Sequence, residues 1–527
     1  MKEKDLSKMA IMNQSVFQNA KNGKLVIDKD YNLNKATLVV PNGMTIDLSG
    51  GTINNGTLVL DDTLLENMNT GSIDARIEGT LRNTIIYTAS IGGINNLHLS
   101  DYSDMTVYCN QNESNVNNTI IISGVNNSGN TNTVFDGMNH HFNCSSTFFS
   151  IRNGSRNVTI KRFIATAVTT ATEIDFQEML SSVGVKNITI TNNTINGFRV
   201  GMSINGGAAA NCYVQDCMVS YNTIYNAKGT TSGHGYGVHL ANARYCTVHS
   251  NNIYNSDRHS IYHAFGDHNT ISGNNIINHR SNYPIGECGV SYSAIDVARR
   301  STNLTIVSNT ISNCYSIGII ISSHSPNREN PTPTAVYPEK YGIMDNIFVT
   351  NNTFSNSNNT DATNGLPSIM VGTNLSTPIL PEDLDTYYVN HVEITNNLFA
   401  RSSTEKMKCI RVVQCKSTKI IGNNFQFNAL NTSHSRELIE YYDQFSNLTQ
   451  MTSEVKENSF VATQNIFSYS VYCVSFQTGI NNSLFDITVS NNILSNQYSG
   501  THQNYKIYKP VGIAASAGSN LHLQTET

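Results

Sequence analysis

The chain of 527 residues has no tryptophan, only 10 prolines and few charged side chains, with 33 basic against 38 acidic residues. A formal charge of −5 gives no basic surface of the kind that binds nucleic acid. No stretch of about 18 apolar residues is present that could cross a bilayer as a helix. We therefore expect neither a nucleic-acid partner nor insertion into a membrane.

Two further features are absent from the sequence: paired cysteines and a secretion signal. None of the 10 cysteines forms a Cys-x-x-Cys pair, so we expect no metal and no cofactor, and interpret the thiols as small apolar core residues. The first twenty residues hold Lys2, Lys4 and Lys8 but no continuous apolar segment of a secretion signal. Either a signal was removed from an extracellular, surface or periplasmic protein, or the protein belongs to a virion tail.

In contrast to these scarce residue types, asparagine is abundant, with 73 copies along the chain. Isoleucine, valine, leucine and phenylalanine are spread in short regular groups, which argues against disorder. A pattern of apolar-x-x-Asn-x-apolar recurs ten times, and its asparagines are Asn193, Asn222, Asn251, Asn274, Asn309, Asn352, Asn397, Asn423, Asn458 and Asn492. Such self-similarity is typical of a repeat protein.

Each copy of the pattern predicts a short strand, a turn at the asparagine and a second strand. A further apolar residue stands two positions before most copies, which is the alternation of a strand and not the period of a helix. Asparagine tolerates left-handed backbone angles, bonds to local backbone groups, and can form ladders between stacked coils. Because one coil cannot bury its own apolar side, the coils must stack as an all-β parallel β-helix.

At Asn193-Thr194-Ile195 and Asn352-Thr353-Phe354 the turns resemble those of right-handed parallel β-helices of the pectin lyase-like superfamily. The resemblance covers most of a β-helix domain expected over residues 25–500. Residues 1–24 are expected to form a cap over its first coil, with a short helix over residues 5–21, since an open coil would expose strand edges. Residues 501–527 are expected to form a C-terminal cap or tail.

A second alignable strand in each coil, within residues 201–371, predicts two columns of side chains on the outer face. The third position of these strands should point outward and form one column. Its members are Ser203, His239, Tyr262, Asp296, Ile320 and Met370. The members of a neighbouring outward column are Tyr236, His259, Ser293 and Ile317.

These columns predict a patch of ionisable side chains over three consecutive coils. Seven of the fifteen histidines fall between His234 and His279. The candidate catalytic residues are Tyr236, His239, His259, Tyr262 and Asp296, and the candidate substrate-binding residues are Arg258, Arg280, Glu287 and Arg299. Histidine and tyrosine exchange protons near neutral pH, and arginine can pair with a uronate carboxylate. His263 aligns with an inward leucine and is expected to be buried and hydrogen bonded.

The stretch from Asn255 to His259 resembles an Asp-Arg-His segment of mannuronan C5-epimerases and related alginate-acting β-helices. Those enzymes also carry Tyr-Gly-x-Asp-Pro-His, whereas this chain has Tyr236-Gly237-Val238-His239 without the Asp-Pro step. The resemblance implies chemistry on a uronate. His239 or His259 would then be the base, Tyr236 or Tyr262 the acid, and Arg258 the group that binds the carboxylate.

Three classes of function remain open from the sequence. The favoured one is a lyase or epimerase acting on a uronate-containing polysaccharide. The second is a glycoside hydrolase, which needs two carboxyl groups about 5 to 9.5 Å apart and would use Asp296 and Glu287. The third is a tailspike or adhesin that binds a surface polysaccharide, and a tailspike would be a homotrimer.

Overall fold

The computed structural model describes most of the chain. It covers residues 6–123, 132–152, 154–168, 175–180, 184–206, 213–229, 234–277, 293–314, 317–323, 343–355, 367–373, 388–401, 408–413, 415–427, 436–443, 451–462, 471–478, 485–496, 505–508 and 520–523. The chain forms two compact units, one of Met1–Gly207 with Asn211–Thr223 and one of Ala208–Ala210 with Ile224–Thr527. Strand β24 (Thr223–Tyr225) contains the boundary.

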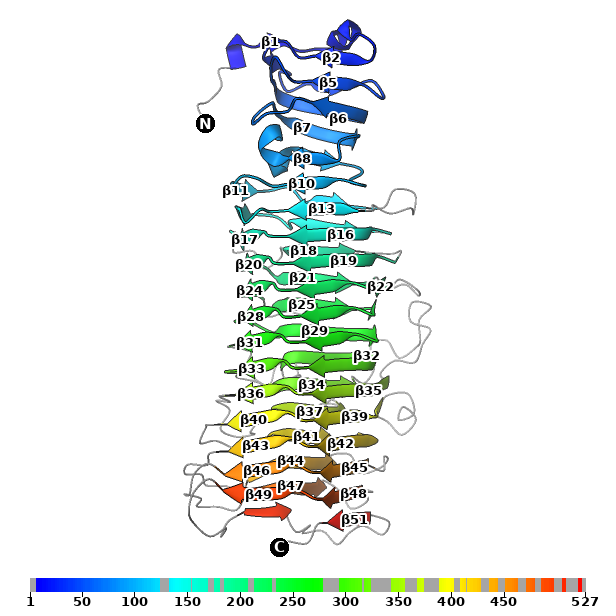
Figure 1. Cartoon of the computed structure of the whole chain (residues 1–527), viewed down its shortest axis with the longest axis vertical. Helices are drawn as coiled ribbons and strands as arrows, with labels where there is room; N and C mark the ends of the chain where they lie inside the picture. Colours follow the sequence, from blue (N-terminus) through cyan, green and yellow to red (C-terminus); the bar gives the residue numbers. More distant parts are fainter. Residues whose placement is uncertain are drawn as a thin grey trace. The chain divides into compact units, whose positions relative to one another are not determined.

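Parallel strands make up almost all of the regular secondary structure described in the first unit (Figure 1). Its N-terminal sheet consists of β1 (Ala10–Ile11), β2 (Lys24–Val26), β3 (Tyr31–Asn32), β4 (Thr37–Val39), β5 (Thr45–Asp47), β6 (Ile53–Glu66), β7 (Ile73–Leu81) and β9 (Leu97–Leu99). Three stacks of strands follow, and they are named A, B and C from here on. Stack A holds β12 (Ile120–Ile122), β15 (Phe149–Arg152), β18 (Gln177–Leu180) and β21 (Val200–Asn205).

The other two stacks of the first unit follow the same coils. Stack B holds β8 (Ile85–Tyr87), β10 (Thr106–Tyr108), β13 (Thr133–Asp136), β16 (Arg156–Lys161), β19 (Lys186–Thr191), β22 (Val214–Gln215) and β23 (Met218–Ser220). Stack C holds β11 (Glu113–Val116), β14 (His141–Cys144), β17 (Ile164–Ala167) and β20 (Thr194–Asn196).

The second unit repeats the three stacks with every pairing parallel (Figure 1). Stack A holds β25 (Tyr236–Ala241), β29 (His259–Asp267), the first part of β32 (Ser293–Val307), β34 (Ile317–Ser323), β37 (Ile369–Thr373), β41 (Ile410–Val413), β44 (Arg436–Asp443), β47 (Val471–Thr478) and β50 (Tyr505–Tyr508). The expected parallel β-helix architecture is therefore present.

Stacks B and C of the second unit complete its coils. Stack B holds β26 (Ala243–Arg244), β27 (Thr247–His249), β30 (Thr270–Ser272), the last part of β32, β35 (Ile343–Thr350), β38 (Tyr388–Val389), β39 (Val392–Thr395), β42 (Ser417–Ile421), β45 (Met451–Lys456), β48 (Phe485–Ser490) and β51 (Asn520–Leu523). Stack C holds β28 (Asn252–Tyr254), β31 (Asn275–Ile277), β33 (Thr310–Ser312), β36 (Thr353–Ser355), β40 (Leu398–Arg401), β43 (Asn424–Phe427), β46 (Ser459–Ala462) and β49 (Ile493–Asn496).

Helices are short and few among the described residues. They are the 3-10 helices η1 (Leu6–Lys8), η2 (Gln14–Asn19), η3 (Thr88–Ile91) and η4 (Ile94–Asn96). The helix expected over residues 5–21 is wrong as one element, because β1 lies between η1 and η2 and pairs with β3. Asn13 accepts a hydrogen bond from the Ser15 N–H and so starts η2 as a separate turn. In the part of the chain that the structure describes, no helix is long and apolar enough to span a bilayer.

Inward side chains of the second unit form a buried apolar core. In stack A these include Val238, Ile261, Ile319 and Ile369, all fully buried. In stack C, four phenylalanines stack face to face with centroids 4.8 to 5.0 Å apart: Phe354, Phe399, Phe425 and Phe460. The eight described cysteines are buried as free thiols, which confirms their interpretation as core residues.

All ten repeat asparagines are buried, and they form ladders. In the second unit Asn309 Nδ2 donates to the Oδ1 of Asn352 (2.9 Å) and to the carbonyl of Ile271 in the preceding coil (2.9 Å). The same pair of bonds recurs at Asn274, Asn352, Asn397, Asn423 and Asn458. Asn251 donates to Asn274, and Asn492 donates to the Val455 carbonyl. The ladders expected from the sequence are therefore present, and they supply partners to backbone groups that the turn would leave unbonded.

The left-handed backbone angle belongs to the residue before each ladder asparagine and not to the asparagine itself. The residues at this preceding position are Asn192, Tyr221, Ser250, Gly273, Ser308, Asn351, Asn396, Gly422, Glu457 and Asn491, with φ between +52° and +67°. A left-handed angle at one residue turns the chain, and the next amide then points inward and bonds along the stack. The sequence assigned both the left-handed angle and the ladder hydrogen bonds to the asparagine. In the structure the first belongs to the preceding residue and the second to the asparagine.

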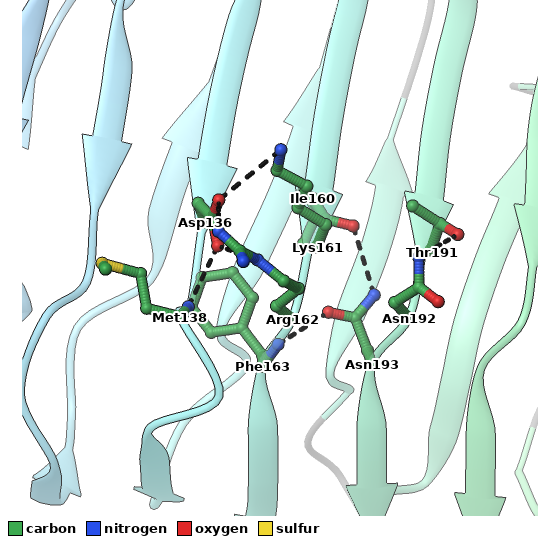
Figure 2. A network of polar contacts seen from close by, with 9 residues as sticks. All are labelled: Asp136, Met138, Ile160, Lys161, Arg162, Phe163, Thr191, Asn192 and Asn193. Carbon is green, nitrogen blue, oxygen red and sulfur yellow. Dashed lines mark hydrogen bonds and ion pairs between the residues drawn. The ribbon is translucent and has the colours of Figure 1, made fainter.

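In the first unit the ladder begins at a phenylalanine (Figure 2). Asn193 accepts a hydrogen bond from the Phe163 N–H (3.0 Å) and donates to the Ile160 carbonyl (3.2 Å). Arg162 precedes Phe163, has φ of +59°, and pairs with the buried carboxylate of Asp136. Burial opposes ionisation of Asp136, but the bonds from Arg162 and from the Met138 N–H outweigh it and keep its pKa below the ordinary value.

We expect Asn352→Ala to lower the free energy of unfolding by about 2 to 4 kcal/mol, because it leaves buried amide and carbonyl groups of two neighbouring coils unbonded. Asn275→Ala is the matched control. The half-buried Asn275 side chain bonds only weakly to Asn252, at 3.3 Å, so its loss should cost about 0.5 kcal/mol or less. Urea unfolding of both variants measures the difference, and equal losses would contradict a structural role for the ladder.

Candidate functional site

Two columns of side chains meet on the outer face of stack A in the second unit. The register pairs His239 with Tyr262, Tyr262 with Asp296, Asp296 with Ile320, and Ile320 with Met370. This confirms the predicted column from His239 to Met370. Ser203 lies on β21 of the first unit, where it is buried.

The neighbouring column stands three residues earlier in each strand, at Tyr236 and His259, which are register partners. Strict alternation would place Tyr236 on the inner side with Val238. A Cβ on Gly237, however, would lie 2.8 Å from the core side chain of Ile253, so position 237 faces inward. Positions 237 and 238 are both inward, and the strand therefore turns Tyr236 to the same side as His239.

Four rings from these columns contact one another. The rings of Tyr236 and Tyr262 stack with centroids 5.1 Å apart and planes 5° apart. His239 lies 5.6 Å from Tyr236 and 5.4 Å from Tyr262, and His259 lies 5.3 Å and 5.6 Å from the same two rings. We call these four residues the aromatic cluster; the predicted patch is thus one set of touching rings.

Burial divides the aromatic cluster into two layers. Tyr236 and His259 are 4% and 1% exposed, whereas His239 and Tyr262 are half-buried and reach the surface. His239 and Tyr262 are therefore the pair that a substrate can touch. Tyr236 and His259 lie behind them and hold their rings.

Arg258 joins the aromatic cluster from the segment just before β29. Its Nη1 donates to the Tyr236 hydroxyl (3.1 Å), and its guanidinium carbon lies 5.3 Å from the centre of the Tyr236 ring. This combines a hydrogen bond with a cation–π contact. The guanidinium is thus tied to Tyr236, and the donors beyond Nη1 are the ones that could bind a ligand carboxylate.

A tight turn fixes the start of both strands. Gly235 has φ of +72°, and a Cβ there would lie 2.2 Å from the carbonyl oxygen of Gly229. The Gly235 carbonyl accepts from the Arg258 N–H (3.2 Å), and the Asp257 carboxylate accepts from the Gly229 N–H (3.0 Å). Only glycine fits at position 235, and Asp257 serves the turn.

The other predicted site residues are only partly placed. Asp296 and Arg299 lie on β32, with Asp296 beside Tyr262 in the register, and their side chains lie outside what the structure describes. Arg280 and Glu287 lie outside the described residues. Within the described ranges no three His, Cys, Asp or Glu side chains gather as a metal site would require.

No protein-family model and no curated protein sequence matches the chain. Among solved structures, the catalytic unit of a thermostable GH87 α-1,3-glucanase from Streptomyces thermodiastaticus is 14% identical over 74% of this chain and 64% of its own, with a TM-score of 0.46. The A-module of a mannuronan C-5 epimerase from Azotobacter vinelandii is 13% identical over 81% of this chain and 99% of its own, with a TM-score of 0.40.

A third structure, the surface adhesin PfbA of Streptococcus pneumoniae, is 14% identical over 67% of this chain and 84% of its own, with a TM-score of 0.42. The strand pairing of the chain itself makes it a parallel β-helix. At these identities the likeness concerns the fold alone. The β-helix spans less than two thirds of the length of the glucanase unit.

His263 lies inside the β-helix, as the sequence predicted. It is fully buried, and its ring nitrogens lie 3.1 Å from Asn269 Nδ2 and 3.0 Å from Ser301 Oγ. Asn269 Oδ1 accepts from the Cys246 N–H, so the Asn269 amide group must donate to His263. The proton of the neutral ring is therefore on Nδ1, and burial lowers the pKa of His263 to about 3.

Sequence analysis missed a second polar group on stack A of the same β-helix. Lys408, Arg411, Glu440 and Ser475 lie beyond Met370, and the register pairs Arg411 with Glu440 and Glu440 with Ser475. The predicted columns stopped at Met370. Extending them by three strands would have found these residues.

We expect the neutral state of His263 to make the β-helix less stable in mild acid. The unfolded histidine gains a proton near its ordinary pKa of 6.5, whereas the folded one does so only near 3. Stability should therefore be complete above pH 6.5 and fall by up to about 1.4 kcal/mol per pH unit between 6.5 and 3. His263→Asn should fall less steeply than the wild type in urea unfolding over this range; parallel curves would contradict the assignment.

Proposed function

We propose that the protein acts on a uronate-containing polysaccharide at the aromatic cluster, by the chemistry of a lyase. The observation that carries this is the contact between His239 and Tyr262, a base and an acid that are register partners on one outer face and both reach the surface. In such an elimination a base removes the C5 proton and an acid protonates the leaving oxygen.

The roles follow from exposure. His239 is the base that takes the proton from C5, and Tyr262 is the acid that gives one to the glycosidic oxygen as the bond to C4 breaks. The electron pair of the C5–H bond becomes the new C4–C5 double bond. Arg258, half-buried beside Tyr236, binds the uronate carboxylate, which stabilises the charge that develops at C5. Tyr236 and His259 are positioning residues.

The geometry favours elimination over epimerisation. His239 and Tyr262 lie side by side on one face of stack A, so both approach the sugar from the same side. An epimerase must return the proton to the opposite face of C5 from the one that lost it. A lyase can use acid and base from one side.

A glycoside hydrolase is the second candidate, favoured by the place of Asp296 next to Tyr262 in the register. It would need a second carboxyl group within about 5 to 9.5 Å. A polysaccharide-binding tailspike or adhesin is the non-catalytic alternative. An extracellular, cell-surface or periplasmic location fits the lyase, the hydrolase and the binding protein alike, because the polysaccharides they would bind occur there.

Incubation with a panel of acidic polysaccharides separates these functions. New reducing ends together with absorbance from unsaturated uronates are the result expected of a lyase. New ends without that absorbance would indicate a hydrolase. Absence of both signals would contradict a lyase and a hydrolase on these substrates and leave an epimerase or a binding protein.

On the substrate that responds, His239→Ala and Tyr262→Phe should each reduce kcat by about 10² to 10⁴-fold, since each removes a group that transfers a proton. Tyr245→Phe is a control, because Tyr245 is an exposed tyrosine that packs on His268, away from the aromatic cluster. Unchanged turnover of both cluster variants would exclude the assigned roles, and loss of turnover in the control would indicate a general effect.

A further inference from the structure

A second stacked pair of tyrosines lies on the outer face of stack B in the first unit. Tyr87 on β8 and Tyr108 on β10 are register partners, and their ring centroids are 5.1 Å apart with 18° between the planes. Tyr87 is 44% exposed and Tyr108 is half-buried, so both side chains reach solvent. The pair lies outside the core and is open to a ligand.

Two cations continue the same column of side chains. The register pairs Tyr108 with Asp136 and Asp136 with Lys161, and Arg162 follows Lys161 at the corner of the coil (Figure 2). Arg162 donates to both oxygens of the buried Asp136 carboxylate, and Lys161 Nζ lies 3.5 Å from it. The Lys161 and Arg162 side chains are nevertheless 36% and 42% exposed. Two cations meet one carboxylate, which leaves one positive charge at the surface.

The tyrosines and the cations belong to one patch. From Tyr87 to Lys161 the column crosses three strand steps, which correspond to about 14 Å. The bond from Arg162 to Asp136 is the main cause that raises the pKa of Arg162, and the nearby Tyr108 contributes in the same direction. We call this set the stack B patch, and its members are Tyr87, Tyr108, Lys161 and Arg162. A surface of this length suits a chain molecule better than a single small ion.

The stack B patch shares two parts with the aromatic cluster and lacks a third. Both contain two stacked tyrosines with centroids 5.1 Å apart, and both have an arginine beside a tyrosine. The register column from Tyr87 through Lys161 to Thr191 contains no histidine. The patch thus has groups that can bind a sugar acid, but its column has no histidine base that would take a proton from one.

The chemistry of these groups selects an acidic saccharide. A tyrosine offers an apolar ring for the C–H groups of a sugar and a hydroxyl for its polar groups. Lys161 has three donors, and the Arg162 guanidinium has five, of which two bond to Asp136. A uronate carboxylate accepts such bonds and complements the positive charge, whereas a neutral sugar would leave that charge unpaired.

We propose that the stack B patch is a second, non-catalytic binding site for an acidic polysaccharide. This rests on the proposed function, because the polymer is the one that the aromatic cluster would cut. Tyr87 and Tyr108 contact the sugar rings, and Lys161 and Arg162 bind a uronate carboxylate. Binding here holds the polymer on the protein and takes no part in the proton transfers.

Calorimetric titration of the full chain with oligosaccharides of alginate and of polygalacturonate tests this site. The parent is His239→Ala, so that the oligosaccharides are not cut during the titration. It should show two binding events, one at the aromatic cluster and one at the stack B patch. Tyr87→Ala and Lys161→Gln, added to this parent, should each weaken one event by about three- to tenfold and leave the other unchanged, since each removes one contact to the sugar.

Tyr221→Ala and Lys186→Gln are the matched controls. Tyr221 is an exposed tyrosine of the same unit, and Lys186 pairs with Asp216 at 3.1 Å outside the patch. Both controls should bind as the parent does. In the chain that keeps His239, the two patch variants should turn over short acidic oligosaccharides at the wild-type rate, and a loss of this turnover would contradict a non-catalytic site.

Three further results decide the proposal. Binding that Tyr87→Ala or Lys161→Gln leaves unchanged would refute this site alone, and either variant is sufficient if the other fails to fold. Equal weakening of neutral malto-oligosaccharide binding by Lys161→Gln would contradict a carboxylate ligand. A parent that binds none of the acidic oligosaccharides would refute the proposed function as well.

Discussion

The structure depends on one hydrogen-bonded asparagine amide in each coil from Asn193 to Asn492. Within this ladder an asparagine donates both to the next asparagine and to a carbonyl of the coil before it, as Asn309 does with Asn352 and Ile271. Without such an amide, a sharp turn between two short strands would bury unbonded backbone groups. The ladder thus allows strands of three or four residues to follow one another at a corner, and it keeps the register that aligns the outer columns.

Much of the fold could be predicted because the same local pattern is repeated ten times. The asparagine positions, the inward isoleucines and the column from His239 to Met370 all follow from alternation and repeat spacing. The division of the N-terminal segment into η1, β1 and η2 could not be predicted, because the first residues do not repeat and Asn13 starts η2 as a separate turn. The left-handed position was assigned to the wrong neighbour, since both residues are often asparagine, as at Asn192 and Asn193.

The residues that form the candidate site could be predicted from the sequence, but how deeply each one is buried could not. Periodicity places Tyr236, His239, His259 and Tyr262 on one face, and their rings do touch. It does not reveal that Tyr236 is buried while His239 reaches the surface, because the side of Tyr236 depends on the double inward step at Gly237. The polar group around Glu440 lies on strands beyond Met370, where the predicted columns end. Its importance depends on burial, which a sequence does not show.

The residues before the ladder asparagines have a further consequence. They share one left-handed conformation, and none of the ten is buried, yet they include tyrosine, serine, glycine, glutamate and asparagine. Because these positions face outward, different side chains fit there, although the left-handed angle costs glycine and asparagine less than the other residues. Within each unit they form a row of outward attachment points with one point per coil. Fluorophores or cross-linkers placed along this row would act as a molecular ruler with the spacing of the strands, about 5 Å.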